Sequence, residues 1–172
     1  MDIDDTNLAP PSDELPAVSA QTNPDGAARS VERVPWLGFF LGDDVYGLPL
    51  GQLREVARLN VLRRIPGAPP RVAGLVNLRG QIVCALDARA ILGLAPQQPS
   101  AGAFFVAFRG FPDPLGVIVD SITDIYAIDP DEIEPPLEAW TAERAALFVG
   151  VARVKEGTIG LLDLHRMVGV TS

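Results

Sequence analysis

Reactive side chains are scarce in this chain of 172 residues, which holds one histidine (His165), one cysteine (Cys84) and one lysine (Lys155). A single cysteine excludes an internal disulfide, and Cys84 lies in an apolar run, which suits a reducing compartment. His165 has no second histidine and no cysteine near it in the sequence, so we expect a surface residue rather than a metal ligand or a general base. The sequence predicts no metal site.

Signatures of nucleotide chemistry and of membrane insertion are also missing. The chain has no G-x-G-x-x-G motif, no phosphate loop ending in Gly-Lys-Ser/Thr and no serine in a nucleophile elbow. No apolar run reaches the roughly 18 residues that a spanning helix needs, and the N-terminus is acidic where a secretory signal would be basic. We therefore expect a cytoplasmic protein that binds no cofactor and does not insert directly into a membrane.

Charge is distributed unevenly along the chain. Residues 1–35 hold seven acids and two arginines, residues 36–94 hold seven arginines and four acids, and residues 95–172 hold eleven acids and five basic residues. Opposite charges on the two halves favour two different partner surfaces, although ordinary solvated faces would look the same. Residues 1–35 are rich in Pro, Ala, Ser and Asp without apolar periodicity, which predicts a disordered acidic tail.

Nucleic-acid binding by the arginine-rich half is not favoured. Small barrels that bind nucleic acids need a basic groove lined with stacking aromatic side chains. No aromatic residue occurs between positions 47 and 103, and the whole chain is acidic. We predict no nucleic-acid partner.

The distribution of apolar residues predicts a mostly β protein built from two similar halves. Val, Ile and Phe cluster in short runs, and helix-length periodic stretches are few. Several positions of the first half recur in the second at nearly the same spacing: Gly80, Ile82, Leu86, Asp87 and Gly93 are echoed by Gly157, Ile159, Leu162, Asp163 and Gly169. Each half would be marginal alone, so we expect the two to share a buried interface.

The one enzymatic alternative is an aspartyl hydrolase, because each half contributes an aspartate, Asp87 and Asp163. Two carboxylates that share a proton can activate water, but each would need a tight loop with small hydroxyl and glycine neighbours. Here both aspartates lead directly into helical apolar patterns. Each fits the N-cap of a short helix, worth about 1 kcal/mol. We therefore predict no enzymatic activity.

The most distinctive local feature is the interruption Asn77-Leu78-Arg79-Gly80 between two apolar runs. A glycine after an arginine at this place predicts a turn that needs a permissive backbone and carries the arginine outward. The simplest interpretation is a hairpin with a solvated arginine. A contact with a partner is the functional alternative.

One set of segments forms a distinctive pattern over about residues 36–170: Phe40-Leu41-Gly42, Tyr46-Gly47-Leu48, Leu53-Arg54-Glu55-Val56, Ile65-Pro66, Val72 to Gly80, Leu86-Asp87-Ala88-Arg89, Gly116 to Asp120, and Gly150. In this pattern the chain resembles the CheW family of bacterial chemotaxis coupling proteins. The resemblance implies a CheW-like fold of two packed five-stranded SH3-like β-barrel subdomains with short helices. The expected subdomains cover about 36–97 and 98–170, and terminal segments are free to swap between the barrels.

The resemblance also implies a function without catalysis. Such an adaptor bridges methyl-accepting chemotaxis receptor tips and the regulatory domain of the histidine kinase CheA, and is recruited to membrane receptor arrays. The family's contact positions fall on Leu53, Glu55, Arg79, Gly80, Ile122 and Ile125. The three aliphatic residues among them fit the core equally well. The same fold in a non-flagellar pathway, controlling pilus motility or a second messenger, is the alternative.

Overall fold

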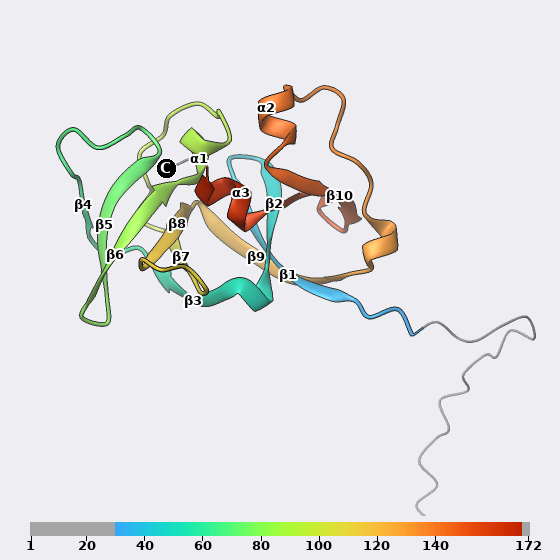
Figure 1. Ribbon diagram of the computed structural model, residues 1–172, viewed down its shortest axis with the longest axis horizontal. Helices are drawn as coiled ribbons and strands as arrows, with labels where there is room; N and C mark the ends of the chain where they lie inside the picture. The colour runs from blue at the N-terminus through green and yellow to red at the C-terminus, as the bar shows by residue number, and fades with distance from the viewer. Residues whose placement is uncertain (1–29, 170–172) are drawn as a thin grey trace, which may run out of the picture. The chain divides into compact units, whose positions relative to one another are not determined.

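Short strands in two sheets dominate the protein (Figure 1). The computed structural model describes residues 30–169, so most of the predicted tail lies outside the described residues. One sheet has the strand order β10-β11-β2-β1-β9, with β1 (Val34–Leu41), β2 (Asp44–Pro49), β9 (Ser121–Ile128), β10 (Phe148–Val154) and β11 (Gly157–Leu162). The prediction of a mostly β fold is confirmed.

The second sheet follows the order β3-β7-β8-β6-β5-β4. Its strands are β3 (Leu53–Arg58), β4 (Leu62–Arg63), β5 (Val72–Leu78), β6 (Gln81–Asp87), β7 (Phe104–Phe108) and β8 (Leu115–Val119). This sheet has one strand more than the expected five, because the two-residue β4 pairs with β5 at its edge.

Strands from both ends of the chain meet in the first sheet. The N-terminal β1 and β2 join β9, β10 and β11, whereas the second sheet is built from the middle of the chain. β11 lies parallel to β2, and β6 lies parallel to β8. The sheets therefore do not follow a division near residue 97.

Short helices connect or follow the strands. They are α1 (Ala88–Ile91), α2 (Ala142–Ala145) and α3 (Leu164–Gly169), with 3-10 turns η1 (Leu50–Gln52) and η2 (Pro130–Glu132). α1 directly follows β6, and α3 comes directly after β11 and one aspartate. The repeated sequence pattern thus corresponds to a repeated strand-then-helix unit, once in each sheet.

Both aspartates of the repeat cap these helices. Asp87 Oδ1 accepts hydrogen bonds from the backbone N–H groups of Arg89 (2.9 Å) and Ala90 (3.2 Å). Asp163 Oδ1 accepts from the N–H of Arg166 at 3.0 Å. The predicted capping role is confirmed, and it explains each carboxylate within its own helix rather than as half of a catalytic dyad.

Removing the cap at Asp87 should cost stability. The expected loss for Asp87→Ala is about 1 kcal/mol of unfolding free energy, because two N–H groups of α1 lose their acceptor in a helix whose Ala88 and Ile91 side chains are buried. Urea denaturation measures this loss. Asp87→Asn keeps an acceptor oxygen and should stay close to the wild type; an equal loss in both variants would mean that the capping bond is not the cause.

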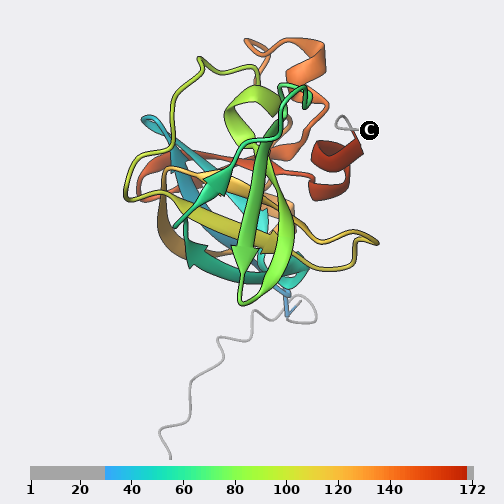
Figure 2. The same ribbon diagram turned by 90° about the vertical axis from the view of Figure 1, so that its left-hand side faces the viewer.

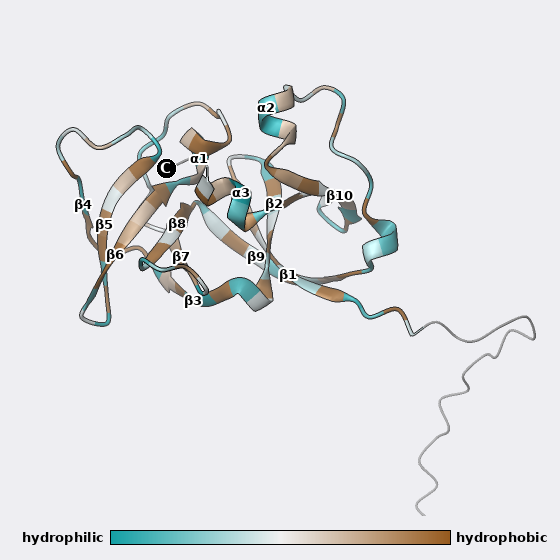
Figure 3. Ribbon diagram, viewed as in Figure 1, coloured by the Kyte–Doolittle hydropathy of each residue, from teal (hydrophilic) through white to brown (hydrophobic). Residues whose placement is uncertain are grey.

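The two sheets share one large hydrophobic cluster. It contains Phe39 from β1, Val106 from β7, Leu162 from β11 and Met167 from α3, all 0% exposed. Figure 3 shows brown, hydrophobic bands on strands of both sheets. This shared core agrees with the expectation that neither half buries its apolar surface alone.

Candidate functional site

The predicted turn between β5 and β6 is present. Arg79 and Gly80 form a two-residue loop in which both φ angles are positive, 52° and 84°. Positive φ at both central residues is typical of a hairpin turn that matches the twist of its strands. The Asn77 side chain accepts a hydrogen bond from the N–H of Gly80 at 2.8 Å and fixes the turn. Figures 1 and 2 show this turn pointing away from α2.

Arg79 meets Glu55, which lies 24 residues earlier in the sequence. Its Nε lies 3.0 Å from Glu55 Oε2, while Arg54 Nε lies 3.8 Å from the other carboxylate oxygen. Arg54 also donates to Gln81 Oε1 at 2.6 Å, so two contacts tie β3 to the hairpin. The structure thus brings two predicted contact residues together.

The two charges differ in exposure. The Arg79 side chain is 81% exposed and that of Glu55 is 18% exposed. An ion pair with one solvated partner adds at most about 1 kcal/mol to stability. The guanidinium therefore has donors left for a second acceptor from a partner.

Exposed aliphatic side chains lie on the same strands. Val56 on β3 is 40% exposed, and Ile82, two residues after the turn, is 54% exposed. Sequence reasoning named neither residue as a partner contact, although each stands close to a residue that it did name. We call Glu55, Val56, Arg79 and Ile82 the hairpin surface.

Leu53 and Gly80 differ in their accessibility to a partner. Leu53 is 6% exposed and belongs to the large hydrophobic cluster, so a partner cannot contact its side chain without opening the core. Gly80 is exposed, and an added Cβ would meet no atom within 4 Å. A side chain there would point into the space that a partner would occupy.

The remaining two predicted residues lie on β9, the outer strand of the first sheet. Ile122 is half-buried and packs against the large cluster, whereas Ile125 is 53% exposed. A shallow groove of about 310 Å³ runs past Ile125 and is also lined by Arg33, Tyr126, Arg153 and Lys155. Ile125 and this groove form the β9 surface.

An ion pair orders one rim of the β9 surface. Lys155 Nζ lies 2.9 Å from Asp124 Oδ2, and this hydrogen bond holds the pKa of the Asp124 carboxyl below its usual value. The same contact raises the pKa of Lys155. Both groups are thus charged around neutral pH, so Ile125 stands beside a fixed pair of opposite charges.

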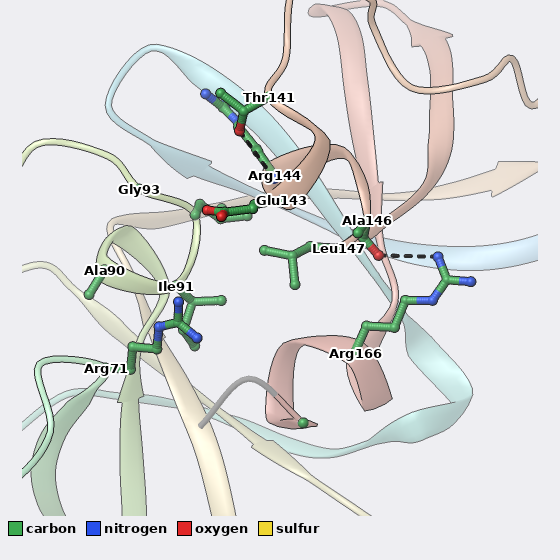
Figure 4. Close-up of a pocket in the computed structure, with 12 residues that line it drawn as sticks. Arg71, Ala90, Ile91, Gly93, Thr141, Glu143, Arg144, Ala146, Leu147 and Arg166 are labelled. Carbon is green, nitrogen blue, oxygen red and sulfur yellow. Dashed lines mark hydrogen bonds between the residues drawn. The ribbon is translucent and has the colours of Figure 1, made fainter. Parts of the chain in front are cut away.

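A cavity lies elsewhere, between the three short helices (Figure 4). Its volume is about 890 Å³, and Ile91 and Leu147 contribute apolar walls. Arg144 donates to the Tyr46 hydroxyl at 2.9 Å, and Arg166 donates to the carbonyl of Ala146 at 3.2 Å. The arginines that line this cavity are far apart in the sequence. No local sequence motif therefore predicted the cavity.

The described residues hold no cluster of three or more His, Cys, Asp or Glu side chains that could bind a metal ion. Within residues 30–169 no helix is long and apolar enough to cross a membrane. His165 is exposed, as predicted, with its ring 5.0 Å from that of Phe111. Cys84 is half-buried, and burial raises the pKa of its thiol, which disfavours the reactive thiolate.

Comparison with known proteins gives a consistent result. The CheW-like domain family model matches residues 35–171. The chain is 26% identical over 140 residues to the chemotaxis protein CheW of Treponema pallidum, covering 79% of this chain and 82% of that protein. It is 23% identical over 133 residues to that of Klebsiella aerogenes, covering 77% and 80%. The crystal structure of the scaffolding protein TtCheW from Thermoanaerobacter tengcongensis superposes with a TM-score of 0.69 at 27% identity, covering 78% and 92%.

Proposed function

This chain belongs to the CheW family, and on that premise we propose that it is a non-enzymatic adaptor that couples methyl-accepting chemotaxis receptors to the histidine kinase CheA. The observation that carries the proposal is the hairpin surface, where β3 and the β5–β6 hairpin are joined by the Glu55–Arg79 pair and expose the aliphatic side chains of Val56 and Ile82. An adaptor needs two separate surfaces of this kind. The β9 surface, on the other sheet, is the second. The protein would act on the cytoplasmic side of a membrane receptor array.

We assign the kinase to the hairpin surface. β3 is one of the two outer strands of the second sheet, and outer strands suit partners that are themselves built from strands. Val56 and Ile82 would supply apolar contact area, and Arg79 would fix the register with a carboxylate or carbonyl of the regulatory domain. Glu55 would hold Arg79 in place before the partner arrives.

We assign the receptor to the β9 surface. The tip of such a receptor is a helical hairpin, and a helix recognises its partner by laying apolar side chains into a groove. Ile125 is the most exposed large aliphatic side chain of the groove beside it. The Asp124–Lys155 pair at the rim can orient polar residues of the helix.

A single substitution separates the two surfaces. Ile125→Asp should weaken receptor binding about tenfold or more, since an acid replaces the apolar anchor, and should leave kinase binding unchanged. Pull-downs with each partner alone measure this. Val149→Asp is the matched control, because Val149 is 47% exposed and lies on β10, the other outer strand of the same sheet. Equal losses from both variants, or loss of kinase binding in Ile125→Asp, would overturn the assignment.

A further inference from the structure

The two sheets of this protein share one plan of strand pairing. Apart from the two-residue edge strand β4, the orders β10-β11-β2-β1-β9 and β5-β6-β8-β7-β3 correspond strand by strand. In each sheet one inner pair is parallel, β11 with β2 and β6 with β8, and the other neighbours are antiparallel. β9 is therefore the counterpart of β3, and the β10–β11 hairpin is the counterpart of the β5–β6 hairpin.

The turns of these two hairpins also correspond. Each hairpin has a loop of two residues, Arg79-Gly80 in one and Lys155-Glu156 in the other. Lys155 thus occupies the loop position of Arg79, the first of the two. The recurring glycines of the sequence, Gly80 and Gly157, differ by one place in the hairpins, so only the strand register reveals that the two cations are equivalent.

The acid that meets each cation stands at an equivalent place. Glu55 on β3 lies 3.0 Å from Arg79, and Asp124 on β9 lies 2.9 Å from Lys155. The residue after each acid is aliphatic, and its side chain is 40% exposed on β3 and 53% exposed on β9. The hairpin surface and the β9 surface are therefore two copies of one arrangement, in which an acid of an outer strand holds a cation of a hairpin turn beside an exposed aliphatic side chain.

Lys155 keeps donors for a further acceptor. Its side chain is 67% exposed, and its ammonium has three N–H donors, one of which Asp124 accepts. Glu156 lies 3.7 Å from the same ammonium. This second acid is already engaged, because burial and a hydrogen bond to Glu156 raise the pKa of the Tyr126 hydroxyl. Lys155 can therefore bind one more carboxylate without losing Asp124.

The charges of the groove beside Ile125 favour an acidic partner residue. The groove is lined by three cations and two acids: Arg33, Arg153, Lys155, Asp124 and Glu132. Arg33 lies 3.9 Å from Glu132, and Lys155 pairs with Asp124. Arg153 is exposed and forms no ion pair with any residue in the range 30–169. The lining therefore carries one positive charge more than its own acids neutralise.

We infer that Lys155 is the receptor-side counterpart of Arg79 and that its ammonium binds a carboxylate of the receptor's helical hairpin. This inference rests on the assignment of the receptor to the β9 surface. An aliphatic residue of the same helix packs on Ile125. Residues three or four positions apart on a helix have Cβ atoms about 5–6 Å apart, which suits a groove of about 310 Å³. The receptor segment thus carries an acid three or four residues from its aliphatic anchor, and Asp124 positions Lys155 without touching the receptor.

Charge reversal at Lys155 tests this contact. The probe is a soluble receptor fragment that contains the hairpin tip, titrated against the full-length protein. Lys155→Glu should weaken receptor binding about tenfold or more, whereas Lys155→Arg, which keeps the charge, should stay within about threefold of the wild type. Arg109→Glu is the matched control, because Arg109 is exposed between β7 and β8 and belongs to neither surface. Its receptor binding should not change, and kinase binding should stay constant in all three variants.

Two further measurements distinguish a receptor contact from an internal ion pair. Asp124→Asn keeps the ammonium and should weaken receptor binding by no more than about threefold; a loss as large as that of Lys155→Glu would overturn the inference. Replacing the acids of the receptor tip by lysine, one at a time, should identify one change that restores binding to Lys155→Glu. Rescue by none of them would also overturn it. Melting curves report whether each variant folds.

Failure of this inference differs from failure of the receptor assignment. If Ile125→Asp weakens receptor binding but Lys155→Glu behaves like Arg109→Glu, the β9 surface still binds the receptor and the role of Lys155 is overturned. If Ile125→Asp leaves receptor binding intact, the assignment of the receptor to the β9 surface fails, and the role of Lys155 fails with it.

Discussion

Replacing Arg79 by glutamate should weaken the three-part assembly of receptor, adaptor and kinase about thirtyfold, or about 2 kcal/mol, while the domain stays folded. The side chain is 81% exposed, so the change alters stability by no more than about 1 kcal/mol. Arg79 has a positive φ of 52°, and glutamate can adopt this backbone conformation as readily as arginine can. In the assembly, however, the new carboxylate would face Glu55 and whatever acceptor Arg79 had engaged.

Reversing the charges of both Arg79 and Glu55 distinguishes a contact with a partner from an ion pair that acts only within the domain. Glu55→Arg alone should weaken assembly as Arg79→Glu does, because it removes the partner of Arg79 at 3.0 Å. The double variant restores an ion pair of opposite polarity within the adaptor. If Arg79 contacts the kinase, the double variant stays weak in pull-downs; full recovery of assembly would show that the pair acts only inside the domain. A melting curve for each variant confirms that the fold is intact.

A single methyl group at Gly116 should destabilise the protein by about 3 kcal/mol, the upper part of the range for overpacking. Gly116 lies in β8, with Ala107 opposite it on β7. A Cβ there would lie 2.4 Å from the carbonyl oxygen of Val106 and 2.5 Å from Cζ of Phe105. The carbonyl belongs to a central strand and cannot move aside without disturbing its ladder. Urea denaturation of Gly116→Ala measures the loss.

The matched control for this substitution is Gly51→Ala. A Cβ at Gly51 would meet no atom within 4 Å, and its φ is not in the left-handed region. Alanine there should leave the unfolding free energy unchanged or raise it slightly, by less than about 1 kcal/mol, through the lower entropy of the unfolded chain. Equal effects of the two substitutions would contradict the close approach of β7 and β8.

Local patterns predicted the elements of this fold but not how they pair. The apolar runs and the Arg79-Gly80 turn are local features, and both are present where the sequence indicated. The pairing of β11 with β2 joins residues more than a hundred positions apart, and no periodicity within either segment specifies it. Among the sequence arguments, only the resemblance to a family included the possibility that terminal strands are exchanged between the two subdomains.

The candidate site shows the same limit. Glu55 was named by resemblance, and its contact with Arg79 is a product of folding, since the two lie on different strands. In β3, burial alternates along the strand, which separates Leu53 in the core from the exposed Val56. Without the strand's register, these two aliphatic residues look alike in sequence. The arginines that line the cavity between the three short helices come from distant segments and converge only in three dimensions.

The parallel pairing of β11 with β2 also sets an order of events during protein synthesis. β2 ends at Pro49 and β11 begins at Gly157, so just over a hundred residues must be translated between them. At about 5–20 residues per second, the ribosome needs on the order of 5–20 s to deliver the missing strand. Until then β2 has an unpaired edge and its buried face remains open to water. The adaptor therefore completes its first sheet only late in translation. Before β11 has been synthesised, β1 and β2 are the segments that most need protection by a chaperone.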